Sequence, residues 1–177
     1  MRKCYALMVL FLVHAAGYAE SIHLQVSSSA DDAHSYGSSG LLTTFSYPRF
    51  GQNGNLEPYE SAMRFVDLPV DAGTDIDSAF IEFRAHTSWS SDSIVYQVVA
   101  EDTADASAFT DRADYDLRLG NLTAPSGTQT IQGATAGDWY RTPDLSHLLE
   151  ALLDRADWRK DSSDIALFLR PTPDSPA

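Results

Sequence analysis

The sequence contains very little cysteine and few positively charged residues. Its 177 residues include one cysteine, Cys4, and 12 Lys and Arg residues against 25 Asp and Glu residues, so the formal net charge is −13. One thiol cannot form an internal disulfide framework or a cysteine-rich metal site. The acidic balance disfavours nucleic acid and anionic membranes as partners and favours an extracellular protein or one that collects cations.

The sequence also lacks an apolar run of the ~20 residues that a membrane-spanning helix needs. The longest run, from about residue 5 to 13, follows Arg2 and Lys3 and precedes the small residues Gly17 and Ala19. This order is typical of a secretory signal peptide, so we predict that residues 1–19 are removed before Glu20. Cys4 is then lost with the leader, and the mature protein is predicted to be secreted or at the cell surface, without membrane insertion.

Sequence motifs of common enzyme classes are absent as well. The chain has no G-x-S-x-G, H-E-x-x-H, P-loop or G-x-G-x-x-G pattern. Its many acidic residues produce carboxylate pairs by chance, and a glycosidase pair is defined only by three-dimensional placement. The sequence therefore favours a protein that is not an enzyme, with a hydrolase as the less favoured alternative.

Most of the remaining chain has the period-two alternation of strands. In residues 78–86, Ala79, Ile81, Phe83 and Ala85 alternate with more polar positions that Phe80 interrupts. Further strands are predicted at residues 41–50, 61–70, 93–100, 117–123, 129–133 and 164–170, with residues 27–40 as a polar loop. Many short strands separated by turns indicate a mainly β protein, an antiparallel jelly-roll-like β-sandwich.

One segment has helical periodicity instead. Leucines at positions 145, 148, 149, 152 and 153 share one face of a helix predicted over about residues 143–155. Thr142, Pro143 and Asp144 are suited to its N-terminus. We expect its leucine face to cover an open end or edge of the sandwich. Residues 20–170 are predicted to form one domain, and residues 171–177 a polar, proline-rich tail or truncated end.

Two acidic loops are candidate calcium sites. One contains Asp31 and Asp32, and the other contains Glu101, Asp102 and Asp105. Clustered carboxylates and loop carbonyls are the ligands that Ca²⁺ prefers, although neither loop has EF-hand spacing. Calcium would have a structural role here. The alternative is that both are solvated acidic loops.

The three tryptophans raise the question of sugar binding. Trp89, in the turn predicted at residues 87–92, is the candidate ligand-binding residue, because an exposed indole can stack on a sugar ring; the alternative is that it anchors its loop. Trp139 is expected to pack near the entrance of the helix, and Trp158 to anchor the helix to the core. Asn121, followed by Leu122 and Thr123, forms a glycosylation sequon.

Residues 61–110 and 139–169 together resemble a module that recurs in large secreted and cell-surface proteins. The resemblance covers about residues 61–169; Glu101 and Asp102 match its "gEd" motif, and residues 142–145 match its "tpdl" motif. It implies a jelly-roll-like β-sandwich similar to carbohydrate-binding modules, without catalytic residues. Modules of this kind usually continue to a last short strand beyond the position of residue 170. Here either the chain is a fragment or the sheet lacks that strand, and in the second case we expect an open edge that another chain could fill by strand addition.

Together these features predict a secreted, non-enzymatic binding module, adhesive or carbohydrate-binding, whose partner is an extracellular glycan or protein. The alternative is a purely structural domain that joins a larger extracellular complex through an open sheet edge.

Overall fold

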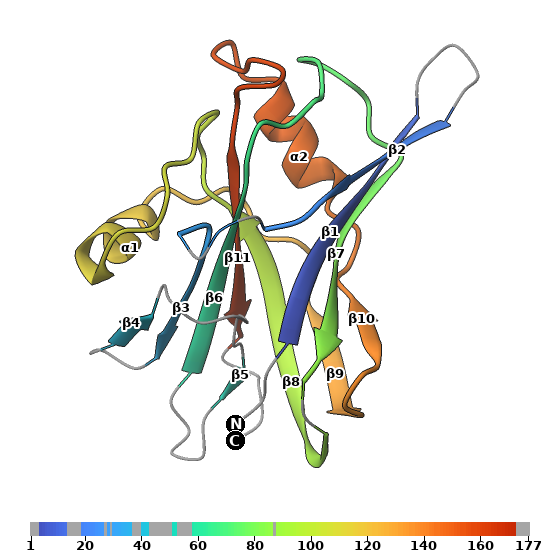
Figure 1. Cartoon of the computed structure of the whole chain (residues 1–177), viewed down its shortest axis with the longest axis vertical. Helices are drawn as coiled ribbons and strands as arrows, with labels where there is room; N and C mark the ends of the chain where they lie inside the picture. The colour runs from blue at the N-terminus through green and yellow to red at the C-terminus, as the bar shows by residue number, and fades with distance from the viewer. Residues whose placement is uncertain are drawn as a thin grey trace.

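The computed structural model describes residues 4–13, 19–26, 28, 30–36, 40–42, 51–52, 58–86 and 88–172. These residues form two antiparallel sheets and two helices, so the prediction of a mainly β protein is confirmed (Figure 1). Residues 43–50 of one predicted strand and residues 173–177 of the predicted tail lie outside the described residues.

The smaller sheet has the strand order β10-β7-β1-β2. Its strands are β10 (Trp139–Arg141), β7 (Ser78–Ala85), β1 (Cys4–Val13) and β2 (Ala19–Leu24). The leader predicted from the sequence therefore contributes strand β1, which lies between β7 and β2. No helix among the described residues is long and apolar enough to span a bilayer.

The larger sheet has the order β4-β3-β6-β11-β8-β9, with β5 also paired to β6. Its strands are β4 (Gly40–Leu42), β3 (Asp32–Tyr36), β6 (Pro58–Phe65), β11 (Ile165–Pro171), β8 (Trp89–Ala100), β9 (Gln129–Ala134) and β5 (Gly51–Gln52). The strands predicted at residues 78–86, 93–100, 129–133 and 164–170 are confirmed.

The main core lies between the two sheets. Ile81 and Phe83 of β7 face Tyr96 and Val98 of β8, and the rings of Phe83 and Tyr96 meet edge to face with centroids 6.4 Å apart. Alternation explains this directly, because every second residue of each strand points to the same side. These side chains are almost completely buried.

The larger sheet is buried on its other face too. Ala166 and Phe168 of β11 pack there against Phe109 and Tyr115, in a second cluster. Tyr115 belongs to α1 (Arg112–Arg118), which Asp111 caps by accepting a hydrogen bond from the backbone N–H of Asp114. A strand that is covered on both faces has apolar residues at consecutive positions, which explains why residues 165–169 are all apolar.

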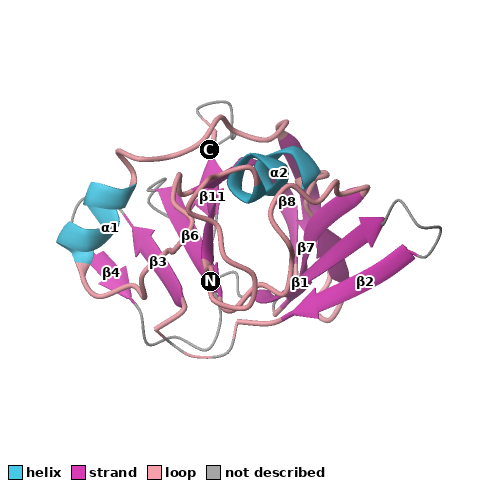
Figure 2. Cartoon of the chain, turned by 90° about the horizontal axis from the view of Figure 1, so that it is seen from above, coloured by secondary structure: helices cyan, strands magenta, loops and turns pink. Residues whose placement is uncertain are grey.

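Helix α2 (Ser146–Leu153) confirms the helical periodicity and the burial of the leucine face. Leu148, Leu149, Leu152 and Leu153 are buried in the main core, and Figures 1 and 2 show the helix across one end of the space between the sheets. The prediction that Thr142 caps the helix is wrong, because Leu145 is the N-cap and the Thr142 hydroxyl accepts a hydrogen bond from the backbone N–H of Ile81. Asp144 does lie at the helix N-terminus as predicted: its carboxylate accepts from the backbone N–H of Ser146 at 3.0 Å, and also from that of Ala79.

Three local predictions are wrong. Residues 117–123, predicted as a strand, instead include the last two residues of α1, which begins after the Asp111 cap. Their one β contact is an isolated bridge at Leu122. Residues 32–36, predicted as loop, form β3, where Ala33, His34 and Ser35 are buried by pairing with β6. Residues 89–92, predicted as part of a turn, belong to β8, and β7 and β8 lie in different sheets.

Candidate binding surface

The outer face of β7 is built by the same alternation that forms the core. Ala79, Ile81 and Phe83 are buried in the main core, while Glu82 is half-buried and Arg84 exposed on the opposite face. One face of a strand therefore supplies hydrophobic packing, and the other presents charged groups outside the core.

Strand β10 adds an exposed tryptophan to this face. Its register pairs Trp139 with Arg84, Tyr140 with Phe83 and Arg141 with Glu82. Tyr140 stacks on Phe83, 6.1 Å between centroids, so its two neighbours point outward. Trp139 is 55% exposed. The expectation that Trp139 packs near the helix entrance is therefore wrong, because it occupies an outward position of an edge strand.

The charged side chains around Trp139 are held in place by their neighbours. Arg141 donates to the Glu82 carboxylate at 2.9 Å, and its guanidinium lies 3.6 Å from the centroid of the Phe80 ring. This contact explains why Phe80 is buried although it interrupts the polar positions of β7. Hereafter Glu82, Arg84, Trp139 and Arg141, with Phe80 beneath, are called the β7–β10 face.

The turn before Trp139 fits closely around Arg84. Arg84 Nε donates to the Gly137 carbonyl at 2.9 Å. Gly137 has φ +94°, a backbone conformation that side chains rarely adopt and that favours glycine. The glycine therefore permits the turn that places its carbonyl against Arg84, beside the indole.

The predicted ligand-binding residue Trp89 lies next to this turn along the backbone. Trp89 pairs with Ala134 of β9, and the adjacent Ser88 hydroxyl accepts a hydrogen bond from the backbone N–H of Ala136 at 2.8 Å. The Trp89 side chain lies outside the described residues. Its role in ligand binding stays a prediction.

The first acidic loop forms an ion-pair cluster with an arginine. Arg64 donates to the Asp31 carboxylate at 2.6 Å and also to the Asp164 carboxylate. Asp32 is not part of these pairs; burial, and then the charge of Asp31, raise its pKa to about 7. A calcium ion bound through Asp31 would compete with the guanidinium of Arg64 for its carboxylate.

The second acidic loop is also paired with arginines. Glu101 accepts from Arg118 at 2.8 Å, and Asp102 accepts from Arg155 at 2.6 Å, whereas Asp105 is exposed. Among the residues that the structure describes, no group of three or more His, Cys, Asp or Glu side chains is placed to hold a metal ion. Calcium binding by these loops stays a prediction.

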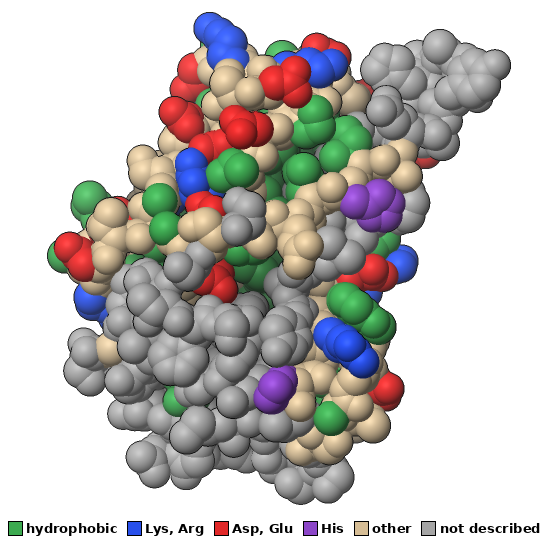
Figure 3. All heavy atoms as spheres, viewed as in Figure 1, with side chains coloured by type: hydrophobic (Ala, Val, Ile, Leu, Met, Phe, Trp, Pro, Cys, Tyr) green, Lys and Arg blue, Asp and Glu red, His purple; other side chains and the backbone are tan. Residues whose placement is uncertain are grey.

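Acidic and basic side chains intermingle near α2. Figure 3 shows them together at the upper end of the molecule. Arg155 pairs with Asp157 as well as Asp102, and Lys160 pairs with Asp71, all at partly or fully exposed positions. This is the pattern of a solvated surface, where single ion pairs contribute little to stability.

The sequon is at the surface. Asn121 is exposed just beyond α1, and its side-chain amide donates to the Asp102 carbonyl at 3.2 Å. A glycan attached to Asn121 would therefore extend into solvent. Glycosylation of Asn121 stays a prediction.

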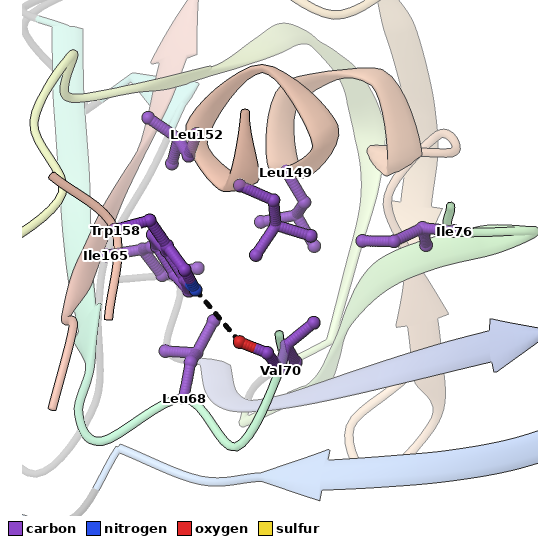
Figure 4. Close-up of a pocket in the computed structure, with 8 residues that line it drawn as sticks. Leu68, Val70, Ile76, Leu149, Leu152, Trp158 and Ile165 are labelled. Atoms are coloured by element: carbon purple, nitrogen blue, oxygen red, sulfur yellow. Dashed lines mark hydrogen bonds between the residues drawn. The ribbon is translucent and has the colours of Figure 1, made fainter. Parts of the chain in front are cut away.

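The pocket beneath α2 is filled by its own side chains. Figure 4 shows Leu149 and Leu152 of the helix facing Leu68, Val70 and Trp158, whose indole N–H donates to the Val70 carbonyl at 2.9 Å. Trp158 is 2% exposed, so it anchors the helix region to the core as predicted. The space between these residues has no room for a water molecule, so it is core packing and not a ligand site.

Sequence reasoning missed the β7–β10 face, although residues 139–141 carried a signal. In the order Trp139-Tyr140-Arg141, an inward tyrosine implies an outward tryptophan and arginine. That signal could be used only once β10 was known to pair with β7 through Tyr140 and Phe83.

The fold and this face define a mainly β protein of two antiparallel sheets with a tryptophan-centred outer surface. In comparisons with known proteins, no family model, no curated protein and no solved structure matches this chain.

Proposed function

We propose that this chain is a secreted, non-enzymatic binding module of the cell surface or extracellular matrix, and that its β7–β10 face binds uncharged carbohydrate. The observation that carries the proposal is the Trp139 indole, 55% exposed between two arginines that neighbouring groups hold in place. Adhesion through extracellular glycans is the biological role that fits such a surface.

The chemistry of the face supports a sugar ligand. An exposed indole offers a flat apolar surface for the C–H face of a pyranose, while Arg84, Arg141 and Glu82 offer hydrogen bonds for hydroxyl groups. Arg141 and Glu82 restrain each other, so less side-chain entropy is lost on binding. The two arginines are balanced by Glu82 and the exposed Asp138, which favours an uncharged ligand.

Other features support secretion and the sandwich class. The basic start, apolar run and small residues of the first 19 positions are typical of a signal peptide. Two antiparallel sheets around one core are the architecture that a jelly-roll-like carbohydrate-binding module requires. The proposal assigns no reaction to the chain and treats calcium as an optional structural ion.

The test is a glycan array followed by titration of the strongest uncharged ligand. Trp139→Ala is expected to weaken binding by ~30-fold or more, because truncating a central tryptophan typically costs about 2 kcal/mol. Trp89→Ala is measured alongside, because its backbone adjoins the same turn. Both variants are expected to keep the wild-type melting temperature if they act on the ligand alone.

Leu117→Ala is the matched control. Leu117 is 79% exposed on α1, so it is another large exposed hydrophobic residue on a separate element. Equal binding by the Trp139 and Leu117 variants, or no glycan binding by the wild type, would reject the proposal and favour the structural alternative. Release of shortened sugars would instead identify a hydrolase.

A further inference from the structure

Among the residues that the structure describes, strand β2 is joined to the smaller sheet through β1 alone. Strand β1 pairs with β7 from Cys4↔Ala85 to Phe11↔Ser78 and with β2 from Met8↔Leu24 to Val13↔Ala19. Within the described part of the chain, β2 pairs with no other strand. Figure 1 shows β1 lying between these two strands.

The opposite edge of β7 is already occupied. Strand β10 pairs with residues 82–84, and beyond it the backbone N–H groups of Thr142 and Leu145 donate to the carbonyls of Ile81 and Ala79. Loss of β1 would therefore open one edge of β7 only. An open edge presents unpaired N–H and C=O groups that can template another strand.

The residues of β1 coincide with the apolar segment of the predicted leader, so this inference rests on the proposed secretion. Cleavage after residue 19 removes the whole of β1 and leaves β2 without a partner. It also removes the strand that lies between β7, whose inward residues belong to the main core, and β2, whose Ile22 and Leu24 pack against that core. The mature chain then has a strand-shaped slot between β7 and β2.

The register defines the chemistry of the slot. Positions 6, 8 and 10 of β1 lie opposite Phe83, Ile81 and Ala79, which are buried in the main core. Positions 7 and 9 lie opposite Glu82 and Phe80 of the outer face. The slot therefore requires apolar residues at alternate positions, and residues 4–13 contain no charge at all.

We propose that the mature protein accepts a strand from another polypeptide in the place of β1. The donated segment runs antiparallel to β7, pairs along the eight positions from Ser78 to Ala85, and is apolar wherever it faces the core. Backbone hydrogen bonds provide affinity, and the alternate side chains provide specificity, as in other cases of strand addition.

The test begins with the folded full chain carrying a protease site in place of residues 14–18. After cleavage, a fluorescent peptide of residues 4–13 with added terminal lysines is offered in excess. We expect it to exchange with the original strand and to remain bound through gel filtration. It should also protect the amides of Phe80, Glu82 and Arg84 from hydrogen exchange, because alternate residues of β7 direct their N–H groups toward β1. The amides of Ala79, Ile81 and Ala85 are bonded at the opposite edge and serve as internal references.

Two matched peptides test the register. Lysines at positions 8 and 10 face the core and should weaken binding by ~100-fold or more, because an unpaired charge cannot be buried cheaply. Lysines at positions 7 and 9 face the outer side, opposite Glu82 and Phe80, and should leave binding within about threefold of the unmodified peptide. Equal binding of both lysine peptides would overturn the proposal.

The remaining outcomes also support or overturn the proposed slot. Unfolding after β1 leaves, reversed by adding the peptide, would support the slot, whereas failure of the peptide to restore the fold would overturn it. Protection of the Phe80, Glu82 and Arg84 amides without any peptide would show that the slot closes and would also overturn the proposal. Secretion is tested separately by the N-terminal mass of exported protein, so a retained leader rejects the proposed secretion whatever the peptides show.

Discussion

Replacing Arg64 with methionine should be among the most destabilising single changes in this protein. Arg64, on β6, donates to the Asp31 carboxylate and the Ala106 carbonyl, each at 2.6 Å, and to the Asp164 carboxylate. Its side chain is 18% exposed, and those of Asp31 and Asp164 are 6% and 9% exposed. Methionine fills similar space without charge and leaves two carboxylates close together with no cation.

The magnitude follows from this burial. Removing one partner of a buried ion pair typically costs 3–5 kcal/mol, because the remaining charge stays desolvated. We expect a loss of about 4 kcal/mol, a large part of the 5–15 kcal/mol that stabilises an ordinary domain. Asp31→Asn in the Arg64→Met background should recover about 1 kcal/mol or more, since it removes one of two neighbouring charges of the same sign.

Urea unfolding followed by tryptophan fluorescence provides the measurement, and Arg170→Met is the matched control. Arg170 lies on the neighbouring strand β11, is 32% exposed and pairs with Glu60 at 3.0 Å. Its loss should cost less than about 1 kcal/mol. If the Arg64 and Arg170 variants lose the same free energy of unfolding, the cluster at Arg64 does not have the structural role argued for it.

Two further predictions concern the acidic loops. The pKa of Asp32, raised to about 7 by burial and by Asp31, means that between pH 3.8 and 7 the folded state binds a proton that the unfolded state lacks. Stability should thus fall as pH rises through this window, and Asp32→Asn should stabilise the protein by roughly 1 kcal/mol near pH 8, after allowance for partial exposure, but not near pH 4. Urea titrations at both pH values check this, and a larger gain near pH 4 would contradict it. Chelation of calcium should shift the melting temperature by less than about 1 °C, because arginines already pair with Asp31, Glu101 and Asp102; a rise of several degrees on adding calcium would instead support the calcium sites predicted from the sequence.

The parts of the fold that could be predicted are those with a strong local pattern. The period-two alternation of apolar residues predicted β7 and β11, and the leucine spacing predicted α2. In each case the buried positions recur with the period of the strand or helix. Helix α1 was missed because only Tyr115 and Arg118 of its seven residues are buried, which leaves almost no apolar period. Strand β3 was missed because His34 and Ser35 are buried by contacts from the rest of the fold, not by their own hydrophobicity.

The candidate sites were harder to predict because their geometry is not local. The sequence shows where carboxylates cluster, but Arg64 reaches Asp31 from 33 positions away and Arg155 reaches Asp102 from 53 positions away. The sequence alone presents these carboxylates as candidate cation ligands, whereas in the structure the arginines form ion pairs with them. Likewise, the exposure of Trp139 depends on which side of β7 receives Tyr140.

Both proposals depend on β7, and its alternation connects them. Its inward residues belong to the core beside the β1 slot. Its outward residues Phe80, Glu82 and Arg84 form part of the β7–β10 face. A strand donated in the place of β1 would put its own outward residues opposite Phe80 and Glu82, and thus beside the β7–β10 face. Partner binding and glycan binding would then share a boundary, so glycan affinity should be measured with the slot both empty and filled. A difference between the two would mean that the partner strand helps to complete the glycan site, whereas equal affinity would mean that Trp139 and its arginines act alone.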